Sequence, residues 1–296
     1  MRWPGKILYF GEHTVLRGSQ ALAGPLDRFG GQWRTGGTPA QQQRLPEWLG
    51  WLRVQQAAGA LATDYRLDDF ATDLATGLYF DSNIPVGYGA GSSGALCAAF
   101  YRRYARDPLP AKLPAQLARL KTIFAELESF FHGSSSGTDP LICYAQAGLL
   151  IRPGGHIERT TLPPLPDPQA FFLVDTGLTR STGPLVEAFL ARCAEESFRQ
   201  NALRKLITVS DVALDTWLQG HFDDLFDTFH ALSTLQRQHL DFLIPKAFFP
   251  LWDQLLSTSH TRLKLCGAGG GGFLLGYTQD KNALTTALHP STFFVL

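Results

Sequence analysis

Net charge of either sign is missing from this chain, because its 26 Lys and Arg residues balance 26 Asp and Glu residues. A protein that binds a nucleic-acid backbone or an anionic membrane by electrostatics carries a basic excess. We therefore expect neither a nucleic-acid partner nor a membrane partner. A bound anion has to be held by local geometry instead of by overall charge.

Cysteine pairs and long apolar runs are also absent. Because the four cysteines lie far apart in apolar surroundings, without a CxxC pair, they favour free buried thiols over disulfides or zinc ligands. No apolar run reaches 18 residues, and Pro4, Gly5 and Lys6 come too early for a signal peptide. The sequence predicts a soluble cytoplasmic protein. The cysteines are Cys97, Cys143, Cys193 and Cys266.

Apolar residues, by contrast, make up 45% of the 296 positions, enough for a large core. A chain of this length suits two domains that share a cleft. Strand-like and helix-like segments alternate irregularly, which favours α+β domains with partly antiparallel sheets. The Pro-rich segment 162–168 is the best candidate boundary, and we expect an N-terminal domain over residues 1–160 and a C-terminal domain over residues 161–296.

Hydrophobic periodicity predicts one long amphipathic helix over residues 113–131. A loop rich in Ser and Gly follows and presents Asp139; a flexible linker is the alternative interpretation. After it we expect an apolar strand over residues 141–145. Further strands are expected over residues 78–84, 171–175, 262–266, 273–277 and 293–296, with helices from about residues 95 and 184 and within residues 200–258.

Residues 85–95, with the sequence PVGYGAGSSGA, lie between a strand-like and a helix-like run. Alternate glycines let the backbone approach a ligand closely, and the helix behind them turns unpaired N–H groups and its positive dipole end toward that ligand. This pattern favours phosphate, although a tight strand-to-helix turn has the same appearance. It is not a Walker A motif, because no Lys follows the glycines, and its third Gly is misplaced for a dinucleotide fingerprint.

Two other segments carry unusual glycine patterns. Residues 4–13 form a strand-like run that contains Lys6 and ends in Gly-Glu-His, where a solvated strand end is the bland interpretation. Residues 267–272 contain five glycines between two apolar strands. A hairpin needs only one or two glycines, so we expect something to press against this backbone.

In this order, residues 4–13, 85–95 and 264–272 resemble the three motifs of the GHMP kinase superfamily. The resemblance implies a two-domain α+β fold, with an N-terminal ribosomal-S5-like domain and a C-terminal ferredoxin-like domain. It also implies that ATP and a small hydroxylated substrate bind between the domains. The sequence leaves the oligomeric state open, and a homodimer is compatible with it.

Within the superfamily the chain most resembles the mevalonate kinases. Val15 and Leu16 stand where galactokinases carry an Asp-Tyr pair, and residues 175–182 are similar to the NTxxxRxT stretch. Residues 132–139 resemble the HGxPSGxD loop, with Ser135 in place of the usual Pro. The implied activity is phosphorylation of mevalonate to 5-phosphomevalonate in isoprenoid precursor synthesis. The alternatives are a sugar kinase, a phosphomevalonate kinase or a non-catalytic binding protein of the same fold.

The matched motifs contain few basic residues, only Lys6, Arg17, Arg180 and Lys264. A phosphorylated acceptor demands more positive charge around its pocket. Mevalonate is therefore the favoured acceptor over phosphomevalonate.

We expect Asp139 to act as the general base and Lys6 to lie beside it, because an ammonium favours the ionised carboxylate and stabilises a forming alkoxide. Mg²⁺ prefers oxygen ligands, and the family pattern implies Ser93 and Glu128. Glu126 would face another side of the helix. The backbone expected to hold the ATP phosphates comprises Gly87, Gly89, Ala90, Gly91, Ser92, Ser93 and Gly94.

The resemblance also implies which residues line the substrate side. Thr182 is expected to approach Lys6 and Asp139 from the C-terminal domain. A structural hydrogen-bonding role is the alternative for His13. The implied substrate residues are Glu12, His13, Thr182, Gly269 and Gly270.

Overall fold

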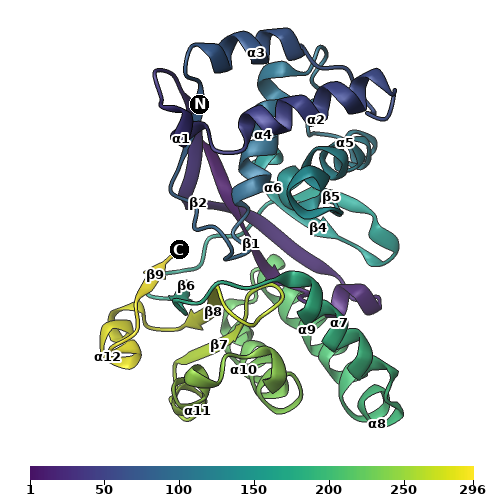
Figure 1. Ribbon diagram of the computed structural model, residues 1–296. Coiled ribbons are helices and arrows are strands. Elements are labelled where there is room, and N and C mark those ends of the chain that lie inside the picture. Colours follow the sequence, from purple (N-terminus) through teal and green to yellow (C-terminus); the bar gives the residue numbers. More distant parts are fainter.

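The computed structural model describes residues 1–296 and contains two antiparallel sheets (Figure 1). The first has the order β1-β2-β4-β5, and β3 also pairs with β2. Strand β2 spans 14 residues, so residues 21–23 pair with β4 and residues 31–34 pair with β3. Its strands are β1 (Trp3–Phe10), β2 (Ala21–Arg34), β3 (Tyr79–Ser82), β4 (Gly148–Ile151) and β5 (Ile157–Thr160).

The second sheet has the order β7-β8-β6-β9. Both faces of β6 are covered, because Phe171 and Leu173 contribute to one apolar core while Phe172 and Val174 contribute to another. This explains why β6 is an unbroken apolar run in the sequence. The strands are β6 (Ala170–Asp175), β7 (Thr261–Leu265), β8 (Phe273–Thr278) and β9 (Phe293–Val295).

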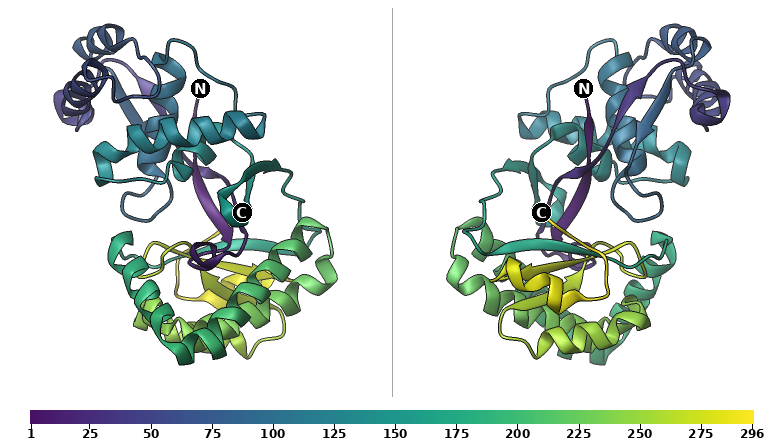
Figure 2. Two further views of the ribbon diagram at one scale, coloured as in Figure 1. Left: turned by 90° about the vertical axis from the view of Figure 1, so that its right-hand side faces the viewer. Right: turned by 90° about the vertical axis from the view of Figure 1, so that its left-hand side faces the viewer.

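Helices cover one face of the first sheet, as Figure 2 shows. The long helix begins with Pro114 at its first position and ends before Gly133, whose φ is 76°. Both residues are typical of those helix ends. The helices are α1 (Pro39–Gln42), α2 (Leu45–Ala57), α3 (Leu67–Ala75), α4 (Ser92–Tyr104), α5 (Pro114–His132) and α6 (Thr138–Ala145).

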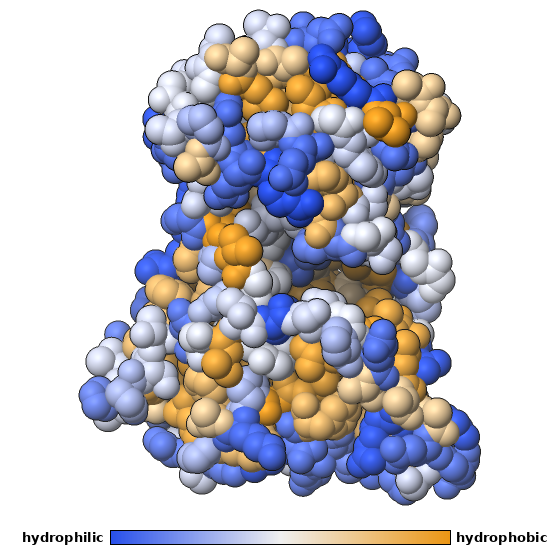
Figure 3. Space-filling view, in the orientation of Figure 1, coloured by the Kyte–Doolittle hydropathy of each residue, from blue (hydrophilic) through white to orange (hydrophobic).

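A second group of helices packs around the second sheet. Figure 3 shows that the molecule narrows to a waist between the half built on the first sheet and the half built on the second. The helices are α7 (Thr182–Ala194), α8 (Glu196–Phe198), α9 (Arg204–Leu218), α10 (Phe222–His239), α11 (Phe249–Leu256) and α12 (Leu284–Leu288). Short helical turns are η1 (Thr14–Arg17), η2 (Pro153–Gly155), η3 (Arg199–Leu203), η4 (Asp241–Leu243), η5 (Lys246–Phe248) and η6 (Lys281–Ala283).

One apolar core is shared by the two halves. It lies between the first sheet and the inner face of the second, and α9 and α10 also contribute to it. Aromatic rings join the halves directly, since Tyr9 lies 4.7 Å from Trp217 and 5.5 Å from Phe171 between ring centroids. The largest members are Trp3, Tyr9, Phe10, Phe171, Trp217, Phe229, Phe273 and Tyr277.

The α+β architecture is confirmed, although both sheets are antiparallel throughout and not only in part, and one expected strand is wrong. Residues 141–145 belong to helix α6, which begins after Gly137 in a left-handed conformation with φ 70°. Asp139 and Pro140 lie in its first turn, where both residue types favour a helix start. A five-residue apolar run does not distinguish a buried helix from a strand.

Two expectations based on composition can be compared with the structure. All four cysteines are free, and only Cys266 is partly exposed. No helix combines the length and apolar character that a membrane span requires.

Candidate active site

Residues 85–95 connect β3 to α4, and Gly91 caps the helix in the left-handed conformation with φ 83°. No backbone carbonyl accepts a hydrogen bond from the N–H groups of residues 87–94. These donors stand at the positive end of a 13-residue helix. Together they form a cradle with the chemistry of a phosphate site.

The glycines of this loop are required by close neighbours. A Cβ on Gly91 would lie 2.8 Å from Lys6 Cγ. A Cβ on Gly94 would lie 3.0 Å from the carbonyl carbon of Asp139, so glycine lets α4 approach α6. This contact explains why Gly94 follows the Ser pair. The loop is also tied to β1, because the Lys6 N–H donates to the Ala90 carbonyl at 2.9 Å.

Lys6 and Asp139 form an ion pair beside this cradle, with 2.9 Å between Nζ and Oδ2. The Lys6 side chain is 10% exposed and that of Asp139 is 37% exposed, so the carboxylate remains accessible. Asp139 is the second residue of α6, where the helix dipole stabilises negative charge. Strand β1 and helix α6 thus bring together the two predicted catalytic side chains.

Ser93 and Glu128 are also brought together. Ser93 Oγ donates to Glu128 Oε1 at 2.8 Å and lies 3.0 Å from His132 Nε2. Burial raises the pKa of the Glu128 carboxyl, as does the charge of Asp139. Glu126 instead accepts from a backbone N–H group on another side of α5.

The third glycine motif, residues 267–272, crosses from β7 to β8 with positive φ at all five glycines. The chain's own backbone presses against it. A Cβ on Gly269 would lie 2.3 Å from the Leu243 carbonyl oxygen, and one on Gly272 would lie 2.4 Å from that of Tyr88. The expectation that something presses against these five glycines is therefore explained in part by tight packing within the chain.

Two contacts from the second half of the chain hold residues 85–95, which we call the phosphate loop. The Arg180 N–H donates to the Gly87 carbonyl at 3.0 Å. The Tyr88 hydroxyl donates to Asp175 Oδ1 at 3.0 Å. The cradle is thus held by hydrogen bonds to the segment after β6.

Glu12 and His13 lie next to each other but face different partners. Glu12 is completely buried and pairs with Lys264 at 2.7 Å, while Gln236 also donates to the same carboxylate. His13 Nε2 lies 3.0 Å from the Ala268 carbonyl, and its Nδ1 is buried without a partner. Burial lowers the pKa of His13 to about 4, so the ring is neutral at pH 7.

Thr182 and the two third-motif glycines make no direct link to the Lys6–Asp139 pair. Thr182 is exposed at the first position of α7. The Gly270 N–H already donates to Leu243 at 2.7 Å.

Arg180, which the sequence analysis did not select, reaches the site instead. Its guanidinium lies over Gly89, and a Cβ on Gly267 would be 2.7 Å from its Nη2. Two of its nitrogens, Nε and Nη1, are buried without a hydrogen-bond partner. Burial lowers the pKa of Arg180, and the charge of Asp139 partly opposes this shift. The sequence signal was the single Arg of the segment between β6 and α7.

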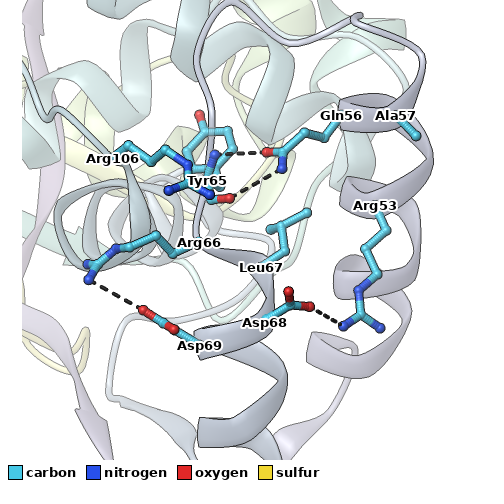
Figure 4. Close-up of a pocket in the computed structure, with 9 residues that line it drawn as sticks. All are labelled: Arg53, Gln56, Ala57, Tyr65, Arg66, Leu67, Asp68, Asp69 and Arg106. Atoms are coloured by element: carbon cyan, nitrogen blue, oxygen red, sulfur yellow. Dashed lines mark hydrogen bonds and ion pairs between the residues drawn. The ribbon is translucent and has the colours of Figure 1, made fainter.

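A surface depression of about 450 Å³ lies elsewhere, between α2 and α3 (Figure 4). Four of its charged side chains are paired with each other, since Arg53 pairs with Asp68 and Arg66 with Asp69. None of its lining residues belongs to the predicted site. It therefore has no part in the candidate active site.

Residues 53–146 match the family described as GHMP kinases N terminal domain. This range contains the phosphate loop, Glu128 and Asp139. The chain has the GHMP kinase fold. This confirms the resemblance that the three glycine motifs indicate. No curated protein matches the sequence significantly.

Solved structures extend the likeness over the whole GHMP kinase fold. Mevalonate kinase of L. major in complex with R-mevalonate has a TM-score of 0.68 at 16% identity, over 99% of this chain and 94% of that one. Lactococcus lactis galactokinase with galactose gives a TM-score of 0.69 at 13% identity, over 99% of this chain and 92% of that one. Streptococcus pneumoniae phosphomevalonate kinase with phosphomevalonate and AMPPNP gives a TM-score of 0.63 at 14% identity, over 100% of this chain and 99% of that one. These TM-scores establish the fold without distinguishing the acceptors.

Proposed function

We propose that this chain is an ATP-dependent kinase that phosphorylates an alcohol, and that its acceptor is mevalonate, which becomes 5-phosphomevalonate. The observation that carries the proposal is the Lys6–Asp139 pair beside a loop of unpaired N–H groups. Phosphoryl transfer needs in-line positioning and neutralisation of phosphate charge, and these groups supply both. A solved neighbour with AMPPNP supports the choice of nucleotide.

The donor set fits a nucleotide and Mg²⁺. The unpaired N–H groups of residues 87–94 would hold phosphate oxygens. Ser93 and Glu128 offer one hydroxyl and one carboxylate, a number of protein ligands that suits Mg²⁺ bound to phosphates and water. Bound Mg²⁺ would neutralise charge on those phosphates.

The chain's own residues would activate the acceptor. Asp139 accepts the proton of the acceptor hydroxyl, and Lys6, whose Nζ lies 2.9 Å from Asp139 Oδ2, stabilises the developing alkoxide.

Two unpartnered groups favour mevalonate as the acceptor. Arg180 presents buried, unpaired guanidinium nitrogens, which match a single carboxylate. The Ala268 carbonyl can only accept, so His13 Nε2 carries the proton and Nδ1 is free to accept from a substrate hydroxyl. Lys6 and Lys264 are already paired, which argues against a phosphorylated acceptor.

We propose domains of residues 1–160 and 161–296, each built on one sheet. Glu12, Thr182, Gly269 and Gly270 stay predictions as substrate residues, and the present contacts support His13 more directly. The four free thiols support a cytoplasmic location, and the balanced charge supports the absence of a nucleic-acid partner.

A substrate panel tests the proposed function. We expect kcat/KM for mevalonate to exceed that for galactose at least about 10²-fold, because a site built for hydrogen bonds rejects molecules that leave its groups unpaired. ATP consumption is measured with mevalonate, phosphomevalonate, galactose and homoserine. If galactose were turned over as fast as mevalonate, the chain would be a kinase whose acceptor is not mevalonate. If no alcohol were turned over, the chain would be a binding protein of the same fold.

Replacing Arg180 tests the orientation of the acceptor. We expect Arg180→Leu to raise the KM for mevalonate about 10- to 100-fold, the effect of losing a hydrogen bond to a charged group. The KM for ATP should change less than about threefold, because Arg180 is proposed to bind the acceptor and not the nucleotide. Arg106→Leu, at an exposed site, is the control. A rise in the KM for ATP alone would place Arg180 on the nucleotide instead.

A further inference from the structure

We infer that Ser135 is a positioning residue that holds the Glu128 carboxylate against Ser93 and fastens to it the loop that carries Asp139. This inference rests on the proposed function, in which Glu128 binds the metal ion. The structure assigns the role to the residue that replaces the usual Pro of the similar loop motif.

Both oxygens of the Glu128 carboxylate are engaged. Ser93 Oγ donates to Oε1 at 2.8 Å, and Ser135 Oγ donates to Oε2. Glu128 is only 5% exposed, and a buried carboxylate needs a donor on each oxygen to remain charged and fixed in place. Without Ser135, Oε2 would lose its only donor from the chain.

The same hydroxyl also holds the loop. Ser135 Oγ accepts from the Gly137 N–H at 2.9 Å, and Gly137 caps α6 two residues before Asp139. The loop lies close against α5, because a Cβ on Gly137 would be 2.0 Å from the Lys121 carbonyl oxygen. Ser135 therefore joins the proposed metal ligand to the proposed base through two successive hydrogen bonds.

Proline at this position cannot make either side-chain contact. It has no hydroxyl to donate to Glu128 and none to accept from Gly137. In this chain Ser135 fixes the Glu128 carboxylate. A loop with proline at this position needs another donor for that carboxylate. Outer partners of metal-ligating carboxylates change metal affinity about 10- to 100-fold when they are removed.

Metal binding measures this role separately from turnover. The full-length protein, saturated with a non-hydrolysable ATP analogue, is titrated with Mn²⁺, and free Mn²⁺ is followed by electron paramagnetic resonance. We expect Ser135→Ala and Ser135→Pro each to raise the Mn²⁺ dissociation constant about 10-fold. Ser135→Thr keeps the hydroxyl, so its Mn²⁺ dissociation constant should stay within about threefold of the parent value.

Ser134→Ala is the matched control, because Ser134 is exposed on the same loop. Affinity for the analogue without metal and the urea midpoint report folding. Parental Mn²⁺ binding in Ser135→Ala and Ser135→Pro, together with lost binding in Glu128→Gln, would overturn the role of Ser135. Parental Mn²⁺ binding in Glu128→Gln would instead overturn the metal site of the proposed function.

Discussion

Asp139→Asn is expected to bind nucleotide like the parent and to lose about 10²- to 10⁴-fold in kcat, the usual contribution of a general base. The amide preserves the shape of the side chain but cannot take the acceptor proton. It also leaves Lys6, whose side chain is 10% exposed, without the anion that lies 2.9 Å from it. The loss should fall on kcat, because the unpaired N–H groups of the phosphate loop remain intact.

Steady-state kinetics and nucleotide binding by calorimetry measure the two effects separately. Asp81→Asn is the control, because Asp81, on β3, forms an exposed ion pair with Arg34. Exposed pairs contribute about 0 to 1 kcal/mol, so this variant should keep its turnover. If Asp139→Asn retained kcat within about threefold of the parent, far from the expected range, Asp139 would not be the base.

Lys264→Met is expected to lower the free energy of unfolding by about 3 to 5 kcal/mol. Lys264 and Glu12 are completely buried, with Nζ and Oε1 2.7 Å apart. Removing the ammonium leaves a carboxylate in an apolar environment, where burial already raises its pKa. Gln236 donates to this carboxylate but carries no charge to replace the lysine.

Urea denaturation measures the effect, and two further variants define its origin. The double variant Glu12→Gln and Lys264→Met removes both charges and should recover at least about half of the loss. Lys281→Met, at an exposed ion pair with Asp167, should cost less than about 1 kcal/mol. A loss of under about 1 kcal/mol in Lys264→Met would show that water reaches the buried pair.

Elements with a strong local pattern were predictable from the sequence. Helix α5 lies within one residue of its expected range because its apolar residues repeat at helical spacing and Gly133 ends it. Strands β6 and β8 match their expected positions, because their apolar runs fit strands that are buried on both faces. The resemblance to GHMP kinases was carried by glycines, whose positions depend on local backbone geometry.

Other features depend on residues that are distant in sequence. Helix α6 was expected as a strand because packing against α4 and α5, instead of periodicity, fixes a short apolar run. Arg180 was overlooked because its importance lies in missing partners, which only three-dimensional surroundings reveal. Lys264, the partner of Glu12, lies near the other end of the chain, and no pattern in either segment predicts the pair.

The apolar core shared by the two sheets limits how the molecule can admit its ligands. Opening the halves as rigid bodies would expose this core, at a cost of about 25 cal/mol for each Å² of apolar surface that water reaches. Release of the phosphate loop breaks a few hydrogen bonds, which run from Arg180 to Gly87, from Tyr88 to Asp175 and from Lys6 to Ala90. Nucleotide exchange should therefore proceed by local loop opening, at a rate that Tyr88→Phe would increase.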